Sequence, residues 1–196
     1  MPETTRYLLL IISSIMIVAS TLPYLIDIVK KKTKPRVVSW FNWALLGTIA
    51  GFAALADGQI PAAMLSFASA LEALLVVTLG MYYGDRHFER FDVLCQIGAA
   101  IGLLLWLVFD SPLTAIIAVT TVDLIAALPT YKHIWQKPFE ETPLAFIICS
   151  FASILTLFAV NRSSLTGLVY PIYILLANTT MSVLLLLRRR RDNRYV

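Results

Sequence analysis

The chain is poor in charge and in cysteine, and no polar stretch in it is long enough for a soluble domain. Only 14% of its 196 residues are charged and 59% are hydrophobic, against about 25% and about 45–50% in soluble globular domains. This composition predicts an integral membrane protein. The two cysteines, Cys95 and Cys149, fall inside apolar runs, where a thiol behaves as a small apolar residue and no disulfide framework is expected.

Several chemical signatures are also missing. The sequence has no Gly-rich phosphate loop, nucleophile elbow or HExxH motif, and His87 and His133, which we expect on the solvated surface, have no neighbours at metal-ligand spacing. We therefore expect no enzyme activity, metal or cofactor. Residues 1–5 lack the basic start of a signal peptide, so the first apolar run is expected to be retained. A retinal protein is excluded because the last run has no lysine for a Schiff base.

Seven apolar runs are each long enough to cross a bilayer, which takes about 20 residues of helix. The sequence therefore predicts an all-α integral membrane protein with seven transmembrane helices. The runs cover residues 7–29, 37–56, 60–83, 91–109, 113–134, 143–160 and 165–187.

The basic residues lie almost entirely in alternate connections between these runs. Only Arg6 and Arg162 are on the side that faces away from the basic segments. Positively charged connections stay in the cytoplasm, so we expect an external N-terminus and a cytoplasmic C-terminus, in the plasma membrane of a bacterium. Anionic lipid head groups, rather than nucleic acid, are the expected partners of the basic segments. The other 14 of the 16 lysines and arginines lie in segments 30–36, 86–90, 132–137 and 188–194.

An internal repeat relates the two halves of the chain. Leu128-Pro129 repeats Leu22-Pro23 at a distance of 106 positions, and Pro143 stands where Pro35 does after an apparent two-residue insertion. We interpret this as two copies of a three-helix unit. Because a single helix connects them, both copies have the same orientation, with a solute path between them. The predicted units are a first repeat in 1–90, a linker helix in 91–111, and a second repeat with a basic tail in 112–196.

Pro23 and Pro129 each remove a hydrogen bond from their helix, and we interpret the pair as hinges, with a fixed bend as the alternative. With this layout the chain resembles the SWEET and PQ-loop superfamily, which has a three-plus-one-plus-three helix plan, an external N-terminus and a proline late in the first helix of each repeat. The chain has Tyr24 and Thr130 where the family motif has glutamine. The family includes sugar facilitators, lysosomal amino-acid exporters and the KDEL receptor, so the resemblance implies a small-solute transporter.

Two carboxylic acids lie near the centres of apolar runs, Glu72 in the third and Asp123 in the fifth. An ionisable residue such as Asp at a helix centre costs about 2.5–3.5 kcal/mol on the insertion scale. Such residues usually face a cavity and mark a solute or proton path. The position related to Asp123 in the first repeat is Ile17, so the site is predicted to be asymmetric. The structural alternative is a protonated carboxyl that bonds to a hydroxyl on a neighbouring helix.

Superposing the cytoplasmic ends of the third and seventh runs brings Glu72 close to Asn178. This arrangement resembles that of SWEET proteins, which have an asparagine on the inner helix of each repeat. Here Asn178 fits the second of these positions and Glu72 replaces the first. A carboxylate in place of an amide favours a cationic or proton-coupled solute over a neutral sugar. We predict a midplane binding site built from Glu72, Asp123 and Asn178.

Further candidates lie on the helix faces that lead to this site. Trp40 and Trp43 have two interpretations, an interfacial aromatic belt or a cavity wall, and the sixth run offers only Phe151 as a counterpart. Gly47 and Gly51 are interpreted as a packing face, with a homo-oligomer contact as the alternative. The predicted cavity-lining residues are Ser20, Tyr24, Trp43, Thr120, Thr130 and Tyr173.

These patterns favour a transporter that exposes its midplane site to each side of the membrane in turn, with one chain sufficient for the path. Proton coupling through the carboxylates would make transport change steeply with pH and would be lost in Glu72→Gln. The alternative is a receptor or assembly and sorting protein that uses the same fold to bind a ligand without moving it. The sequence does not identify the solute.

Overall fold

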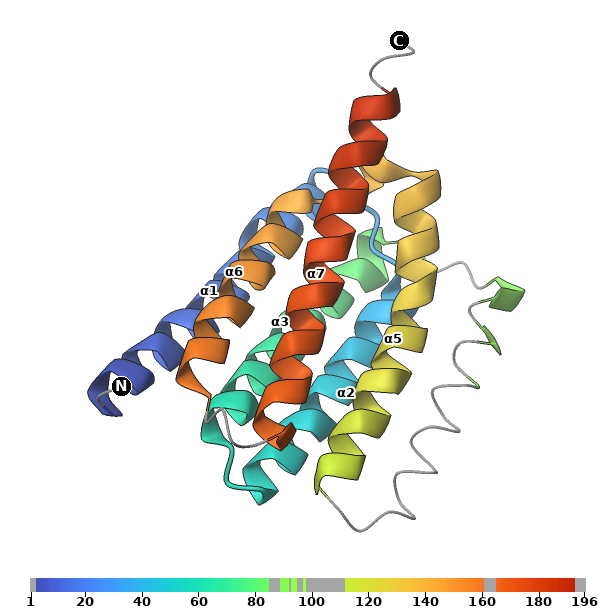
Figure 1. Cartoon of the computed structure of the whole chain (residues 1–196). Coiled ribbons are helices and arrows are strands. Elements are labelled where there is room, and N and C mark those ends of the chain that lie inside the picture. The colour runs from blue at the N-terminus through green and yellow to red at the C-terminus, as the bar shows by residue number, and fades with distance from the viewer. Residues whose placement is uncertain are drawn as a thin grey trace.

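The computed structural model describes residues 3–84, 89–91, 93, 94, 97, 112–160 and 165–192, and these form an all-helical protein (Figure 1). Six of the seven predicted runs coincide with helices, whereas most of the fourth run, with Cys95, lies outside the described residues. The helices are α1 (Glu3–Val29), α2 (Val37–Ala56), α3 (Ile60–Tyr83), α5 (Pro112–Gln136), α6 (Pro143–Ala159) and α7 (Leu165–Asp192), with a 3₁₀ turn η1 (Pro138–Glu140) before α6.

Four helices, α1, α2, α3 and the Gly167–Arg191 part of α7, are long and apolar enough to cross a membrane. Their outward faces carry large apolar side chains that stay exposed, among them Ile15, Phe52 and Leu176, each at least 60% exposed. Exposed apolar surface on this scale is unusual in a soluble monomer. The structure therefore has the character of a membrane protein.

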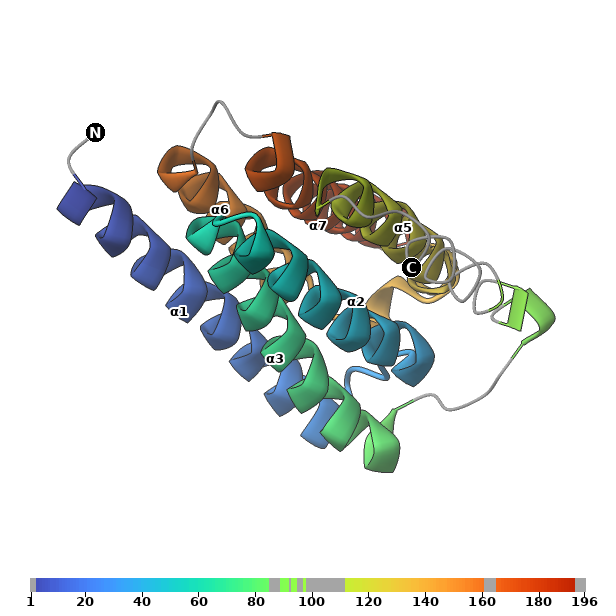
Figure 2. The ribbon, with the colours of Figure 1, turned by 90° about the horizontal axis from the view of Figure 1, so that it is seen from below.

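The six helices form a closed ring in the order α1, α3, α2, α5, α7, α6, with α6 packed against α1 again. Figure 2 shows the ring as two rows, α1–α3–α2 and α6–α7–α5. Exchanging α1, α2 and α3 with α5, α6 and α7 leaves the order of neighbours unchanged. In Figure 1 the odd-numbered helices run upward and the even-numbered ones downward, so paired helices point the same way.

Close approach of α2 and α3 depends on two glycines of α2. A Cβ at Gly47 would lie 3.1 Å from the Ser66 carbonyl oxygen, and one at Gly51 would lie 2.7 Å from Cδ1 of the Phe67 ring. Small residues at a four-residue spacing allow two helix backbones to come this close. The predicted packing face is therefore confirmed, and it serves a contact within the chain.

The connections at the two ends of the ring differ in character. At one end α2 turns tightly into α3 through Gly58, which has a left-handed backbone (φ 69°). The opposite end, called here the lysine-rich end, holds segments 30–36 and 137–142, and there the Lys34 amide donates to the Glu140 carbonyl over 3.0 Å. Helices α1 and α5 both run without a break through their prolines, so the hinge role of Pro23 and Pro129 stays a prediction.

We predict that Gly51→Leu destabilises the protein by about 1–3 kcal/mol, because the larger side chain overlaps the Phe67 ring and separates α2 from α3. Thermal unfolding of the purified protein in detergent measures the effect. Leu55→Val, on the same helix at a position that is 50% exposed, is the matched control and should leave the melting temperature nearly unchanged. An unchanged melting temperature in Gly51→Leu would show that the interface is loosely packed.

Candidate functional site

The cavity between the two rows of helices brings the three predicted site residues together. Glu72 from α3, Asp123 from α5 and Asn178 from α7 all line it, together with predicted Trp43 and Tyr173. Its volume is about 60 Å³, enough for about four water molecules. The other lining residues are Trp40, Ser69, Ala73, Phe146, Cys149, Tyr170, Ile174, Ala177 and Met181.

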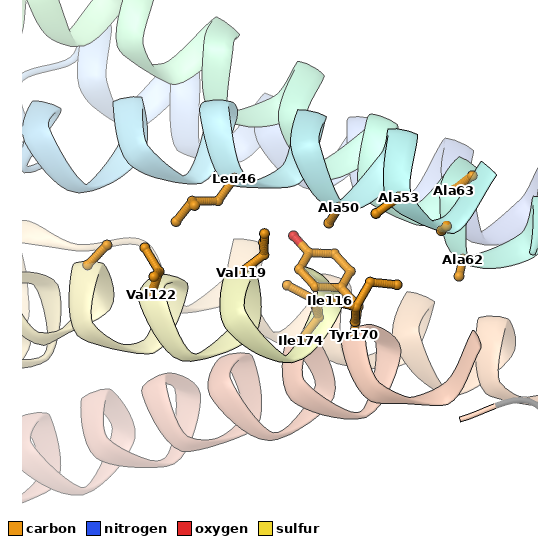
Figure 3. Close-up of a cluster of buried hydrophobic side chains, with 12 residues drawn as sticks. Leu46, Ala50, Ala53, Ala62, Ala63, Ile116, Val119, Val122, Tyr170 and Ile174 are labelled. Carbon is orange, nitrogen blue, oxygen red and sulfur yellow. The ribbon is translucent and has the colours of Figure 1, made fainter. Parts of the chain in front are cut away.

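Apolar clusters pack on both sides of the cavity along the helix axes. Toward the α2–α3 turn, Leu46, Ala50, Ile116 and Val119 pack with Tyr170, and Figure 3 shows the Tyr170 ring between the side chains of α2 and α5. Toward the lysine-rich end, a second cluster includes Ile28, Ile134 and Leu185 near the helix ends. The cavity thus lies between two packed apolar layers.

Glu72 is held by side chains from two other helices. It is only 6% exposed, and Ser20 Oγ of α1 donates to its Oε1 over 2.9 Å. The Cys149 thiol of α6 lies 3.5 Å from Oε2 and also donates to the carboxyl. Glu72 therefore joins both rows of the ring. Its bond with the Ser20 hydroxyl is also the contact expected if Glu72 has only a structural role.

Asp123 has a different environment. It is 2% exposed, yet its Oδ1 has no hydrogen-bond partner among the described residues, while the Tyr173 hydroxyl lies within bonding reach of the carboxyl. A buried polar atom left without a partner costs about 1–3 kcal/mol. The Asp123 carboxyl thus has an unused acceptor at the cavity.

Asn178 presents an acceptor in the same region. Its Nδ2 donates to the Ile174 carbonyl one turn earlier in α7 over 2.9 Å. With one amide N–H used inside the helix, the side-chain oxygen is left for a molecule in the cavity. The predicted site therefore combines a carboxyl held by helix donors, at Glu72, with two acceptors that are available to a ligand.

Aromatic rings form the wall toward the lysine-rich end. Trp40 and Trp43 pack edge to face with ring centroids 4.9 Å apart, and Tyr24 packs behind Trp40 at 4.9 Å and against Phe146 at 6.2 Å. Trp40 is 4% exposed, so the interpretation of Trp40 as part of an interfacial belt is wrong. It is buried because α2 turns this face toward the cavity.

Residues at a constant spacing of 106 positions occupy related places in the cavity wall. Trp40 corresponds to Phe146 and Glu72 to Asn178, and Trp43 corresponds in the same way to Cys149. Phe151, the expected aromatic counterpart, is 58% exposed and faces outward, so that prediction is wrong.

The error comes from Pro143. Helix α2 begins at Val37 and α6 at Pro143, 106 positions apart, so no insertion separates the two helices. Pro143 is the first residue of α6, whereas Pro35 precedes α2. Phe146 and Cys149 could have been found by applying the 106-residue spacing without the shift.

The remaining predicted lining residues are placed outside the cavity lining. Ser20 acts through Glu72, and Tyr24 lies behind Trp40. Thr120 and Thr130, on α5, have hydroxyls with no bonding partner among the described residues but do not border the cavity.

One expectation for the lysine-rich end is wrong. His133, expected on the solvated surface, is 6% exposed and lies 3.4 Å from the Glu140 carboxyl. It is buried because α5 packs this face against η1. Nearby, Asp27 of α1 accepts a hydrogen bond from the Thr142 hydroxyl over 2.9 Å, because that connection folds back over the end of α1.

The same end is closed by a polar network that sequence analysis did not find. The Tyr24 hydroxyl donates to Oε2 of Glu141 over 2.5 Å, and Arg189 Nε donates to the Pro138 carbonyl over 2.8 Å. Arg189 also donates to the Glu141 carbonyl. These bonds tie α1 to α7 through the segment that precedes α6. No sequence signal pairs Tyr24 with Glu141, because they lie in different halves of the chain.

Comparison of the chain with protein-family models, with curated proteins and with solved structures gives no match. Within the part of the chain that the structure describes, no three histidine, cysteine or acidic side chains come together as a possible metal site. The described lining of the cavity offers carboxyl, amide, hydroxyl, thiol and aromatic groups.

Burial raises the pKa of Glu141 from an ordinary value of 4.5 to about 8, against the opposing effects of the Tyr24 hydroxyl and Arg189. Folding then takes up a proton between these pH values. We predict that the free energy of unfolding falls as pH rises from about 4.5 to about 8, by up to about 1.4 kcal/mol per pH unit. Glu141→Gln should remove most of this decline.

Thermal unfolding of the purified protein between pH 5 and pH 9 measures the effect. Glu3→Gln, at the exposed start of α1, is the matched control and should keep the slope of the parent chain. Equal slopes in Glu141→Gln and in the parent would show that another group causes the pH dependence.

Proposed function

We propose that this protein is a small-solute membrane transporter, cation-selective or proton-coupled, that exposes its midplane cavity to the two sides of the membrane in turn. The observation that carries the proposal is the convergence of Glu72, Asp123 and Asn178, from both rows of the ring, on one cavity. Ionisable residues inside a membrane protein are costly, and they usually serve a solute or proton path.

The proposed architecture is two parallel three-helix repeats joined by a linker helix in 91–111, as in the SWEET and PQ-loop superfamily. The symmetric order of neighbours in the ring supports it, and so do the cavity-lining pairs at the 106-residue spacing. In this architecture a relative tilt of the two rows, with Pro23 and Pro129 as hinges, opens one side of the cavity while closing the other.

The proposed membrane is the plasma membrane of a bacterium, with the lysine-rich end in the cytoplasm. This orientation is supported by the positions of the lysines and arginines. The Tyr24–Glu141 bond would then form part of the cytoplasmic gate, since it joins α1 of the first repeat to the segment before α6 of the second. Opening toward the cytoplasm requires this bond to break.

The second candidate is a receptor or sorting protein that binds a ligand in the cavity without moving it. The observation that favours it is the bonding of Tyr24, Glu141 and Arg189, which holds the lysine-rich end closed. A receptor keeps that end closed when its ligand binds, whereas a transporter opens it. The two functions therefore differ in whether the cavity is reached from one side or from both.

Cys149 is a natural reporter for this difference, because its thiol lines the cavity and is 6% exposed. We predict that a membrane-impermeant thiol reagent modifies Cys149 in the Cys95→Ala chain both in spheroplasts and in inside-out vesicles. Mass spectrometry measures the modified fraction. Modification from one side alone would support the receptor, and protection from both sides would contradict alternating access.

The control for this measurement is the Cys95→Ala/Cys149→Ser chain, which should not be modified from either side. Its comparison with the parent shows that the label is on Cys149. A lipid-permeant thiol reagent applied to the same vesicles gives the total amount of reactive Cys149, against which the two impermeant reactions are scaled.

A further inference from the structure

The cavity offers a ligand carboxyl and amide acceptors and aromatic rings, together with the hydroxyl and indole N–H groups of its serine, tyrosine and tryptophan side chains. Asp123 Oδ1 has no partner among the described residues, and the amide of Asn178 has one N–H already bonded to Ile174. Glu72, by contrast, is held by donors from Ser20 and Cys149. The unused oxygens of Asp123 and Asn178 are satisfied by a ligand that supplies N–H donors.

We propose that the cavity binds a small primary ammonium ion that lacks an acidic group, with Asp123 and Asn178 as acceptors of its N–H groups. This inference rests on the proposed function, because it names the solute class of the same cavity. Asp123 fixes the position of the ammonium group, since its buried Oδ1 is an acceptor that no described residue uses. A hydrogen bond between two charged groups is roughly twice as strong as a neutral one.

The aromatic walls fit the same ligand. Tyr170 and Tyr173 pack with ring centroids 6.2 Å apart on the α7 side of the cavity, and Trp40 and Trp43 face it from α2. Ring faces attract a cation within about 6 Å, and tryptophan attracts it most strongly. An alkyl chain attached to the ammonium group would contact the apolar parts of Ile174 and Met181, which also line the cavity.

The lining also excludes acidic ligands. Among the described residues that line the cavity there is no lysine, arginine or histidine, so the carboxylate of an amino acid would be buried without a positive partner from them and next to carboxyl groups. Unpaired charge is a strong means of rejecting a ligand. The cavity volume of about 60 Å³ suits a small ligand in this conformation.

The test measures how fast a neutral thiol reagent, N-ethylmaleimide, modifies Cys149 in Cys95→Ala membrane vesicles. Propylammonium is the ligand, and glycine, propionate and tetramethylammonium are matched in size. Glycine adds a carboxylate to the ammonium group, propionate has only the carboxylate, and tetramethylammonium has the charge without N–H donors. We expect saturating propylammonium to slow the modification at least tenfold and the other three to change it less than twofold.

Variants then locate the contact. Asp123→Asn should raise the propylammonium concentration needed for protection at least tenfold, because the charge that assists the hydrogen bond is removed. Thr121→Val, on the same helix but on its exposed face, is the matched control and should leave that concentration unchanged. The comparison of the four ligands is made with the native cavity, so the test remains decisive if Asp123→Asn does not fold.

Three results would overturn the inference. Equal protection by glycine would show that the cavity accepts a carboxylate. Equal protection by tetramethylammonium would show that N–H donors are not needed for binding. No protection by propylammonium would show that primary ammonium ions are not the ligand class. If the impermeant reagent modifies Cys149 from both sides of the membrane, none of these three results contradicts the proposed transport function. Protection by propylammonium together with one-sided modification would instead reject transport and keep the ligand class.

Discussion

The constraint on which the structure depends is the burial of two carboxylic acids among apolar helices. A membrane supplies no partners for a buried polar atom, so the helices themselves must supply them. For Glu72 they do, because Ser20 of α1 and Cys149 of α6 both donate to it. This requirement brings α1, α3 and α6 together at one level and so fixes how the two rows of the ring meet.

Asp123 differs from Glu72, because the described neighbouring helices do not supply partners for both of its carboxyl oxygens. One of its oxygens is buried without a partner among the described residues, so the carboxyl keeps an unsatisfied acceptor beside the cavity that it lines. Stability alone would favour a donor or an apolar side chain there, as in the first repeat, where Ile17 is fully buried. Retaining an unsatisfied polar group is understandable where a ligand completes it.

The two rows have the same plan but different side chains, and the differences concentrate at the cavity. At the spacing of 106 positions, Trp40 corresponds to Phe146, Glu72 to Asn178 and Ile17 to Asp123. A symmetric scaffold in this way carries an asymmetric site. The two ends differ as well, since an apolar cluster packs near the tight α2–α3 turn at one end and a polar network around Glu141 lies at the other.

The sequence by itself determined the positions of the six described helices, the packing role of Gly47 and Gly51, and the unusual status of Glu72 and Asp123. These follow from properties of short stretches of the chain, namely the length of an apolar run that can form a membrane-spanning helix and the free-energy cost of burying a charge in it. The same reasoning failed for Trp40 and His133, because the face that a helix buries depends on its neighbours.

Only the tertiary structure decided which residues complete the site. Phe146 and Cys149 were missed because one displaced proline suggested a shift that the helices do not have, and Glu141 was missed because its partner Tyr24 lies 117 positions away. Hydrogen bonds between distant segments leave no periodic trace in a sequence. The sequence could therefore identify the costly carboxyls, but only packing shows that one is satisfied by its neighbours and that the other keeps an oxygen without a partner among the described residues.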